Sequence, residues 1–379
     1  MVKYRFEQIA INSTDKKKPV EEDRFTYLGL EHLDSGSLKV TRFGSEVAPI
    51  GEKLVMHKGD VLFGKRRAYQ KKVAIAPFDG IFSAHGMVLR PREDVIDKSF
   101  FPLFISSDYF LDAAIKISVG SLSPTINWRD LKTLEFELPD LATQRKLAET
   151  LWSINDTMET YKKLIAATDE LVKSQFMELF GDPVTNTQGR EVRPFKDFML
   201  DIRYGTSQPP TFNELGEFKF IRATNIKAGR ITENGMLRIS ADEAAKIEKC
   251  RLNGNEIIIV RSGANTGDTC VVTDEYRDQY AGYDIIVTLN LEIANPVFFN
   301  ELMNTHYMQA IIKPLTVRAA QPHINSEQVQ NLPMLVVPLQ EQEQFSSFVR
   351  QSDKSKFELE KALSELTATY KRIIAENLG

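Results

Sequence analysis

The amino-acid sequence predicts an α/β (α+β) protein with two globular domains in tandem, each followed by one long helix. Two observations carry this prediction. One order of sequence features runs twice through the 379 residues, and each copy ends in a long stretch with apolar residues at helical spacing. The patterns predict a first domain over residues 1–140, a first helix over 141–181, a second domain over 182–340 and a second helix over 341–379.

The duplication is clearest around a short Pro-x-Ile-Asn element that closes each domain. Pro124–Asn127 reads PTIN and Pro322–Asn325 reads PHIN, and at the same spacing Gln144 in the first helical stretch matches Gln342 in the second. Upstream, FTYLGLEHLDSGSL resembles FKFIRATNIKAGRI, and GDVLFGKRR resembles NEIIIVRSG. Matches that keep the same order along nearly the whole chain indicate a tandem duplication.

Each helical stretch has apolar residues at alternating steps of four and three, the spacing of a coiled-coil stripe. A first helix from about Leu141 to Phe180 would be roughly 60 Å long. Asp140 is its expected N-cap, and Gly181 is its expected stop. The expected contact stripe, for the partner helix or a partner protein, consists of Leu147, Leu151, Ile154, Met158, Tyr161, Ile165, Val172, Leu179, Leu359, Leu363, Leu366, Tyr370 and Ile373.

Shorter patterns predict the elements inside each domain. Arg24–Leu30 is an expected strand, and Leu54–Phe63 is an expected strand pair broken at Lys58–Asp60. Phe100–Ile117 and Val297–Ile312 occupy matching places in the two copies, and each is expected to form one helix.

Composition narrows the class of protein. Hydrophobic content of 42% and charged content of 26% are ordinary for a soluble globular chain. Cys250 and Cys270 are the only cysteines, so the sequence predicts neither a disulfide framework nor a zinc site. No segment is apolar enough to span a membrane and the N-terminus is unlike a signal peptide, which favours a reducing cytoplasm. With a net charge of −4, binding to nucleic acid would depend on local basic patches.

Motifs of catalysis are not found. The five histidines show neither HExxH nor HxH spacing. No GxSxG elbow is present, and no GxGxxG motif follows a strand. The sequence therefore predicts no catalytic residue, no metal site and no cofactor.

One candidate for DNA contact lies in the first domain. The segment KRRAYQKK, residues 65–72, has five basic residues and one tyrosine. Basic side chains neutralise phosphates, and an interleaved aromatic or guanidinium can meet bases. A solvated hairpin tip is the alternative interpretation. The candidate contact residues are Lys65, Arg66, Arg67, Tyr69 and Lys71.

Two loops of the second domain are further candidates. DIRYGTSQPP, from Asp201 to Pro210, holds a dense set of groups able to contact phosphates and bases. RSGANTG, from Arg261 to Gly267, follows a buried strand but lacks the Gly-Lys-Ser/Thr ending of a P-loop. Ordinary polar loops are the alternative. The candidate residues are Tyr204, Thr206, Ser207, Gln208, Arg261, Asn265 and Thr266.

Two variable α/β units, each closed by Pro-x-Ile-Asn and followed by a long helix, resemble the specificity subunit of type I restriction–modification systems. The resemblance covers essentially the whole chain and includes ELFGD at the end of the first helix, YGTSQPP, RSGANTG and IRATNIKAGRI. It adds Arg222 and Asn225 to the candidate DNA contacts. The first domain, however, shows no segment that aligns with YGTSQPP.

The resemblance implies two target-recognition domains, each reading one half of a split site in double-stranded DNA. It also implies that the two helices form an antiparallel coiled coil, which gives pseudo-two-fold symmetry. The implied partners are two DNA-methyltransferase subunits and ATP-dependent restriction subunits, which carry out the catalysis. The alternative is a coiled-coil adaptor that binds proteins without recognising DNA.

Overall fold

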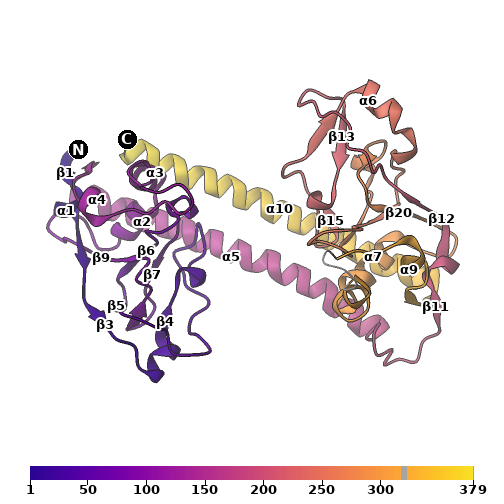
Figure 1. The fold of residues 1–379 in the computed structure, drawn as a ribbon, viewed down its shortest axis with the longest axis horizontal. Helices are drawn as coiled ribbons and strands as arrows, with labels where there is room; N and C mark the ends of the chain where they lie inside the picture. Colours follow the sequence, from indigo (N-terminus) through magenta and orange to yellow (C-terminus); the bar gives the residue numbers. More distant parts are fainter. Residues whose placement is uncertain (317–321, 379) are drawn as a thin grey trace. The chain divides into compact units, whose positions relative to one another are not determined.

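A computed structural model describes residues 1–316 and 322–378. The chain divides into unit 1, made of Met1–Lys163 and Glu360–Gly379, and unit 2, made of Leu164–Leu359. The long helices α5 (Leu141–Phe180) and α10 (Leu339–Leu378) each contribute to both units (Figure 1). None of the helices in the described part of the chain has the length and apolar character that a membrane span requires.

Unit 1 is built on two four-stranded sheets, with strand orders β2-β9-β6-β7 and β3-β5-β8-β4, and on a two-stranded sheet of β1 with β10. Paired strands run antiparallel, except that β4 and β8 are parallel. The elements are β1 (Val2–Arg5), α1 (Phe6–Ile9), β2 (Ala10–Ser13), β3 (Lys16–Lys17), β4 (Tyr27–Leu28), β5 (Lys53–Met56), β6 (Val61–Phe63), β7 (Val73–Ile75), β8 (Gly80–Phe82), β9 (Met87–Pro91), α2 (Phe101–Ser106), α3 (Asp108–Lys116), α4 (Trp128–Leu131) and β10 (Glu135–Leu138).

Unit 2 repeats this plan, with sheets β12-β20-β17-β18, β16-β13-β19 and β11-β21 and a small β14-β15 pair. Its one parallel pair among the described strands is β13 with β19. The elements are β11 (Val192–Pro194), β12 (Met199–Tyr204), β13 (Phe218–Ile221), β14 (Ile226–Lys227), β15 (Arg230–Ile231), β16 (Leu237–Ile239), α6 (Ala241–Lys246), β17 (Ile257–Ile259), β18 (Thr269–Val271), β19 (Tyr280–Ala281), β20 (Ile285–Leu289), α7 (Pro296–Asn304), α8 (Lys313–Thr316), α9 (Ser326–Gln330) and β21 (Pro333–Leu335).

Strand register shows that the two units are copies of one fold. In unit 1, Leu62 of β6 pairs with Val88 of β9, and in unit 2, Ile258 of β17 pairs with Ile286 of β20. The neighbouring strands β2 and β12 then pair with the other edges of β9 and β20. The duplication predicted from sequence order is therefore confirmed in the topology.

Four predicted elements differ from the structure. The expected loop Asp201–Pro210 begins inside strand β12, which continues to Tyr204. The expected single helix Phe100–Ile117 is two helices, because Ser107 is extended and its Oγ accepts a hydrogen bond from the Phe110 N–H as an N-cap. The second copy breaks at the matching Thr305, where α7 ends and a π-helical turn, Met308–Ile312, follows. Helical spacing continues through both breaks, so periodicity alone misses them. The expected strand Arg24–Leu30 is a 3₁₀ turn followed by the short β4.

Both ends of α5 coincide with the predicted ones. The Asp140 carboxylate accepts hydrogen bonds from the Thr143 N–H and hydroxyl, each at 2.9 Å, and so acts as the N-cap. Gly181 has φ +76° and donates its N–H to the Met177 carbonyl at 3.0 Å. A left-handed residue after the last turn is the usual helix stop, and glycine adopts it without strain.

The predicted contact stripe is buried at only two of its positions. Leu151 and Val172 are buried, whereas the other predicted members are half-buried, except that Leu179 is exposed. Beyond Val172 the buried face of α5 moves to Phe176 and Phe180, because both rings pack on Phe298 of α7 and Phe345 of α10 in the unit 2 core, at centroid distances of 5.1–5.6 Å. The helix thus turns its apolar face toward the domain as well as toward the other helix.

Within unit 2 the two long helices run antiparallel. Asp169 of α5 contacts Lys356 of α10, while Phe176, further along α5, contacts Phe345, which is earlier in α10. The antiparallel arrangement implied by the resemblance is present in this unit.

A buried glutamine joins the first turn of each long helix to its domain. Gln144 accepts a hydrogen bond from the Asp97 N–H (2.8 Å) and donates to the carbonyls of Val95 (3.1 Å) and Pro139 (2.8 Å). Gln342 makes the same three bonds in unit 2, accepting from the Asn295 N–H (2.8 Å) and donating to the carbonyls of Ile293 and Val337 (3.1 and 2.7 Å). Both side chains are buried, so each amide satisfies main-chain groups that water does not reach.

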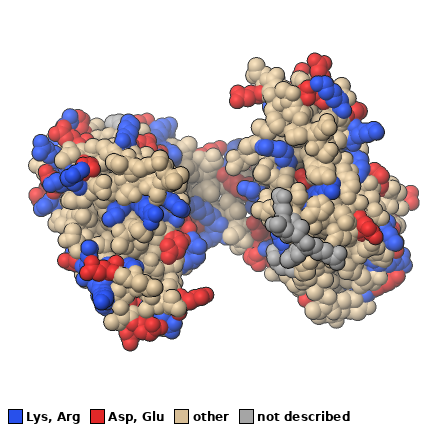
Figure 2. Space-filling view, in the orientation of Figure 1, with Lys and Arg blue, Asp and Glu red and all other residues tan. Residues whose placement is uncertain are grey.

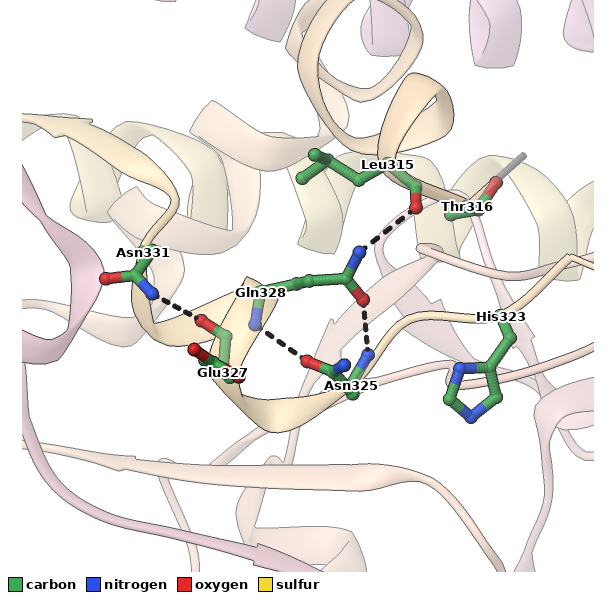
Figure 3. A pocket seen from close by; sticks show the side chains of 7 residues that line it. All are labelled: Leu315, Thr316, His323, Asn325, Glu327, Gln328 and Asn331. Carbon is green, nitrogen blue, oxygen red and sulfur yellow. Dashed lines mark hydrogen bonds between the residues drawn. The ribbon is translucent and has the colours of Figure 1, made fainter. Parts of the chain in front are cut away.

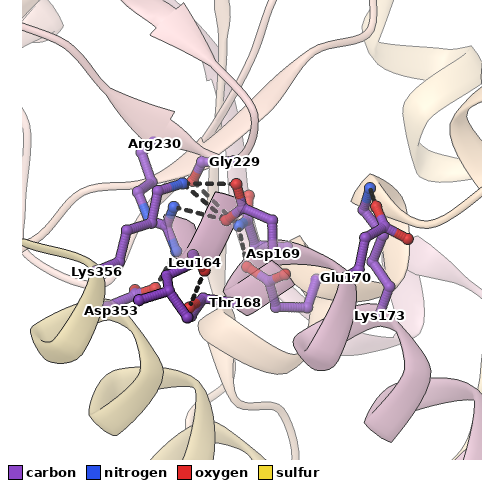
Figure 4. A network of polar contacts seen from close by, with 11 residues as sticks. Leu164, Thr168, Asp169, Glu170, Lys173, Gly229, Arg230, Asp353 and Lys356 are labelled. Carbon is purple, nitrogen blue, oxygen red and sulfur yellow. Dashed lines mark hydrogen bonds and ion pairs between the residues drawn. The ribbon is translucent and has the colours of Figure 1, made fainter. Parts of the chain in front are cut away.

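A charged cluster lies between the two helices of unit 2 and a turn of its domain (Figure 4). Arg230, in the turn, is paired with Asp353 of α10 and lies 3.6 Å from Asp169 of α5. Lys356 donates to both carboxylate oxygens of Asp169 at 2.7 and 2.8 Å. Burial raises the pKa of the neighbouring Glu301 to about 7, although the charge of Arg230 opposes this shift.

Unit 1 has a cavity where unit 2 has this cluster. Ser37 takes the place of Arg230 in the duplicated turn, and Asn155 and Thr367 take the places of Asp353 and Asp169. These three residues line a cavity of about 850 Å³, together with side chains of α3 and Tyr370. Asn155 Nδ2 is buried without a hydrogen-bond partner among the described residues. The two halves therefore join helix and domain by different means.

We expect substitution of Gln342 by leucine to destabilise unit 2 by about 3–5 kcal/mol, because one donor and two acceptors of the main chain lose their buried partners. Thermal or urea unfolding followed by circular dichroism would measure the loss. Gln344→Leu, an exposed change on the same helix, is the matched control and should shift stability by less than about 0.5 kcal/mol. Equal effects of the two variants would contradict the role of the buried amide.

We expect Glu301→Gln to stabilise the protein at pH 8 by about 2–3 kcal/mol, with the gain disappearing toward pH 5. A folded-state pKa of about 7 lies above the ordinary value of 4.5, so the folded state binds this proton more tightly and loses stability as pH rises between these values. The neutral glutamine has no such dependence. Unfolding free energies measured from pH 5 to 8 test this, with exposed Glu358→Gln as control; a gain independent of pH would contradict it.

Candidate nucleic-acid interface

Groups from three separate segments of unit 2 meet at one edge of the sheet β12-β20-β17-β18. β12 ends at Tyr204, Arg261 lies two residues beyond β17, and Tyr283 lies two residues before β20. Because β20 runs antiparallel to both β12 and β17, the ends of those strands and the start of β20 share an edge. The topology therefore brings Tyr204, Arg261 and Tyr283 together.

The guanidinium of Arg261 lies over both tyrosine rings. Its Cζ is 4.5 Å from the ring centroid of Tyr204 and 4.1 Å from that of Tyr283. The two rings are neighbours, with centroids 6.4 Å apart and planes inclined by 31°. Arg261 Nε also donates a hydrogen bond to His323 Nε2 at 2.9 Å. Cation–π contacts and this bond hold the guanidinium in one place.

The main chain behind this cluster is fixed as well. The Arg261 N–H donates to Asp284 Oδ1 at 3.0 Å, and its carbonyl accepts from the Ile324 N–H at 2.9 Å. Burial raises the pKa of Asp284 to about 6, against the opposing hydrogen bond and charge of Arg261. Gly205 packs so closely that a Cβ there would lie 1.8 Å from the carbonyl oxygen of Gly282. The loop after β12 therefore requires glycine at this position.

The rest of the YGTSQPP loop extends from this edge. Thr206 Oγ1 donates to the Gln208 carbonyl at 2.8 Å and accepts from the Gln208 N–H at 3.2 Å. Ser207 and Gln208 have exposed side chains. Ser207 and Gln208 can meet a ligand, while Thr206 shapes the turn that presents them.

Two of the candidate residues, Asn225 and Thr266, have buried side chains whose polar groups already bond within the protein. Asn225 is fully buried, and its amide nitrogen donates to the carbonyls of Thr232 and Asn234, both at 3.2 Å. Thr266 is also buried, and its hydroxyl donates to the Gly263 carbonyl at 2.6 Å. These internal hydrogen bonds give Asn225 and Thr266 structural roles in their turns, which corrects their expected place on the DNA-contacting surface.

Arg222 and Asn265 are partly exposed and use some of their donors internally. Arg222 Nη2 donates to the Gly235 carbonyl at 2.8 Å, and its Nε is buried without a partner among the described residues. Asn265 Nδ2 donates to the Ala223 carbonyl at 3.2 Å. Both stay candidates, with fewer free groups than Ser207 or Gln208.

The basic segment of unit 1 divides into two parts. Arg66 and Arg67 are exposed, and Arg66 bonds to Ser123 Oγ (3.0 Å) and His85 Nε2 (3.3 Å). Tyr69 is 57% exposed, so its ring is available for stacking. Lys65 is half-buried, and this burial, together with the charge of Lys16, lowers the pKa of its ammonium group.

Lys71 differs from the other basic residues of this segment. Its ammonium lies 2.7 Å from carboxylate oxygens of both Asp108 and Asp112 on α3. These two acids raise the pKa of Lys71 but also neutralise its field. Lys71 therefore joins the segment to α3 and contributes little positive charge to the outer surface.

The structure shows which residues of unit 1 correspond to the start of the YGTSQPP loop of unit 2, although the two sequences do not align there. Ser13 pairs with Val88 as Arg203 pairs with Ile286, so Thr14 occupies in unit 1 the place of Tyr204 in unit 2. Lys65 likewise takes the place of Arg261, because its carbonyl accepts from the Ile126 N–H at 2.9 Å. The two edges share a framework but present different side chains.

The Pro-x-Ile-Asn element supports the edge in unit 2 and leads into α9 (Figure 3). Asn325 Oδ1 accepts from the Gln328 N–H at 2.8 Å, and Gln328 Oε1 accepts from the Asn325 N–H at 3.0 Å, which forms a capping box. Gln328 Nε2 also donates to the Leu315 carbonyl at 3.1 Å. His323, at the variable position of the element, is thereby placed beside Arg261.

The candidates named from the sequence include Arg261 and Tyr204, which the structure brings together, but not Tyr283, His323 or Asp284, which lie beside them. Tyr283 and Asp284 follow β19 in a segment without a motif, and only strand pairing brings them to the edge. His323 carried a signal, since it lies inside the recognised Pro-x-Ile-Asn element. Its role depends on a contact with a residue 62 positions away along the chain.

Charge is distributed rather than concentrated. On the visible face of each unit, Lys and Arg are interspersed with Asp and Glu (Figure 2). Across the described residues, no group of three or more His, Cys, Asp or Glu side chains is arranged to hold a metal ion. Local basic groups such as Arg66, Arg67 and Arg261 are candidates for attracting a polyanion.

Comparisons with known proteins agree with this architecture. The family model described as "Type I restriction modification DNA specificity domain" matches residues 16–168 and 191–367. The specificity subunit of type I restriction enzyme EcoDI from Escherichia coli is 27% identical over 187 residues, 48% of this chain and 41% of that protein. The EcoKI specificity subunit from Escherichia coli strain K12 is 21% identical over 197 residues, 49% and 42% of the two chains. The matches span less than half of each relative.

Solved structures share the fold. The S subunit of a type I restriction–modification system from M. genitalium superposes with a TM-score of 0.61 at 14% identity, covering 100% of this chain and 96% of that one. A chain from a study of complex assembly and conformational transition of the type I R-M system gives 0.54 at 17% identity, covering 99% and 97%. Since the family model matches the two domains in turn and covers most of the chain, this protein belongs to the family of type I restriction modification DNA specificity domains.

Proposed function

We propose that this chain is the sequence-specific DNA-binding subunit of a type I restriction–modification complex. Each domain would read one half of a bipartite site in double-stranded DNA. The observation that carries the proposal is the pair of family matches, one for each domain. The matching sheet edges, with Arg261 in one copy and Lys65 in the other, supply groups suited to DNA.

The recognised site is asymmetric in this proposal. Tyr204, Arg261 and His323 of unit 2 correspond to Thr14, Lys65 and Thr125 of unit 1. Different donors and aromatic surfaces at equivalent places select different bases. Two unlike half-sites follow, in contrast to the palindrome that a symmetric dimer would read.

Partner subunits complete the proposed complex. A duplicated chain offers two similar surfaces, which suits two copies of one methyltransferase subunit. ATP-dependent restriction subunits would join this core. Methylation and cleavage would reside in those partners, and this chain would contribute recognition without catalysis or a cofactor of its own.

We expect this chain, expressed with its methyltransferase partner in a host without DNA methylation, to direct modification to one split, asymmetric motif. Methylome sequencing is the measurement. Expression of the methyltransferase alone is the control and should leave the motif unmodified. A stable complex that adds no methylation at any motif would contradict the proposal and support the adaptor alternative.

We expect combined charge reversal of Lys65, Arg66 and Arg67 to weaken DNA binding by the complex and to reduce its salt dependence. Removal of one phosphate contact lowers the slope of log K against log salt by about 1. Fluorescence anisotropy with a duplex containing the motif, at several salt concentrations, measures both quantities.

The matched control for this variant reverses Lys3 and Arg5 of β1 and Lys98 between β9 and α2, which are exposed cations of unit 1 outside the basic segment. The control should retain both the affinity and the slope of the unmodified chain. If the two triple variants behave alike, the basic segment has no special part in binding, as the adaptor alternative expects.

A further inference from the structure

We propose that Arg261 reads one guanine in the half-site bound by unit 2, and that Tyr204, Tyr283 and His323 are positioning residues for this contact. The inference rests on the proposed function and names one base contact within it. It concerns a cluster whose members come from four separate segments of the chain.

Two tyrosine rings and a histidine orient the guanidinium of Arg261. The ring centroids of Tyr204 and Tyr283 lie 4.5 and 4.1 Å from its Cζ and 6.4 Å from each other, so both rings pack against it. Its Nε is occupied by His323 Nε2 at 2.9 Å, which is the one side-chain hydrogen bond of Arg261 to the described residues. The terminal nitrogens Nη1 and Nη2 make no hydrogen bond to the described residues, and the ring contacts and the Nε bond set the direction in which this pair of donors points.

The terminal nitrogens of Arg261 match the acceptors of one particular base. Two parallel donors of an arginine fit the O6 and N7 acceptors that guanine presents in the major groove. A phosphate also accepts two such bonds, but phosphate contacts do not require a pre-oriented guanidinium and can be made by exposed cations such as Arg67. Arg261 instead has its side chain stacked and its main chain held by Asp284 and Ile324. A guanidinium that is ordered before binding loses less conformational entropy when it contacts a base. Because its donors are held in one place, it distinguishes guanine from other bases more strongly.

Unit 1 presents a different side chain at the equivalent place. Lys65 stands where Arg261 stands, and its ammonium group makes no cation–π contact within the described part of the chain, where Thr14 replaces Tyr204. A lysine ammonium is a compact charge without the planar fork of arginine. The guanine reader is therefore a property of unit 2, and the half-site of unit 1 serves as an internal control in every experiment.

The test compares methylomes of the complex with Arg261→Lys or unchanged Arg261. We expect Arg261→Lys to relax one G·C position in one half of the motif, with discrimination there falling roughly 5- to 150-fold. The other half should stay as it is, which also shows that the variant folds and assembles. Arg277→Lys, at an exposed arginine of unit 2 paired with Asp274, is the matched control and should leave both halves unchanged.

A second experiment distinguishes a contact of Arg261 with the guanine base from a contact with a phosphate. Duplexes carry 7-deazaguanine at the relaxed position, which removes the N7 acceptor and leaves every phosphate in place. The unmodified chain should bind this duplex more weakly than the guanine duplex, while the Arg261→Lys complex should bind the two alike. A uniform loss of affinity for all sequences in Arg261→Lys, with no sensitivity to 7-deazaguanine, identifies a phosphate contact and overturns the inference.

The positioning residues are tested by conservative rescue. Tyr283→Phe keeps the ring and should keep the guanine preference, whereas Tyr283→Leu should relax it at the same position as Arg261→Lys. His323→Gln retains an acceptor for Arg261 Nε and should preserve more discrimination than His323→Ala. Unfolding would change both halves of the motif together, so it is distinguished from loss of positioning.

The outcomes also separate this inference from the proposed function. If the unmodified complex methylates no motif, the proposed function fails and no reader is needed. If it methylates a split motif that Arg261→Lys leaves intact, or relaxes at an A·T pair, the function stands and the guanine reader is wrong.

Discussion

The buried amides of Gln144 and Gln342 are the contacts on which the arrangement of each unit depends. Each amide, in the first turn of a long helix, bonds to one N–H and two carbonyls of the chain around it, in a place where water does not reach. Breaking any of these bonds would leave a buried polar group without a partner, so the helix cannot rotate or slide on its domain cheaply. A recognition surface carried by such a domain inherits a defined direction relative to its helix.

Beyond this shared joint, the two halves have diverged in how helix and domain are held. Unit 2 fills the space with Arg230, which connects its turn to Asp353 and Asp169. Unit 1 has Ser37 and Asn155 in the matching places and leaves a cavity of about 850 Å³. These side chains are each more than a third exposed, so the ion pairs add little net stability. Unit 2 thus joins helix and domain through charged groups at a place where unit 1 has small polar side chains and a cavity.

Sequence reasoning succeeded where the signal is local and failed where it depends on pairing between distant segments. The ends of α5 follow from Asp140 and Gly181, whose effects act within one helical turn. The breaks at Ser107 and Thr305 were missed because helical periodicity continues through them. The burial of Phe176 in place of the predicted stripe depends on the packing of α7, and the approach of Tyr283 to Arg261 depends on the register of β20. The spacing of apolar residues along the chain predicts neither the burial of Phe176 nor the contact between Tyr283 and Arg261.

Under the proposed function, the differences between the two edges would let one fold, used twice, specify a site without symmetry. The framework that must stay constant is made of main-chain bonds: the carbonyls of Lys65 and Arg261 both accept from the isoleucine N–H of the Pro-x-Ile-Asn element. Side chains around that framework are free to vary, because they project from strand ends and loops rather than into the cores. Thr14 stands in unit 1 where Tyr204 stands in unit 2, and Thr125 stands where His323 stands, while the main-chain framework is the same in both. Recognition can therefore change one domain at a time, while the glutamine joints keep each domain in place on its helix.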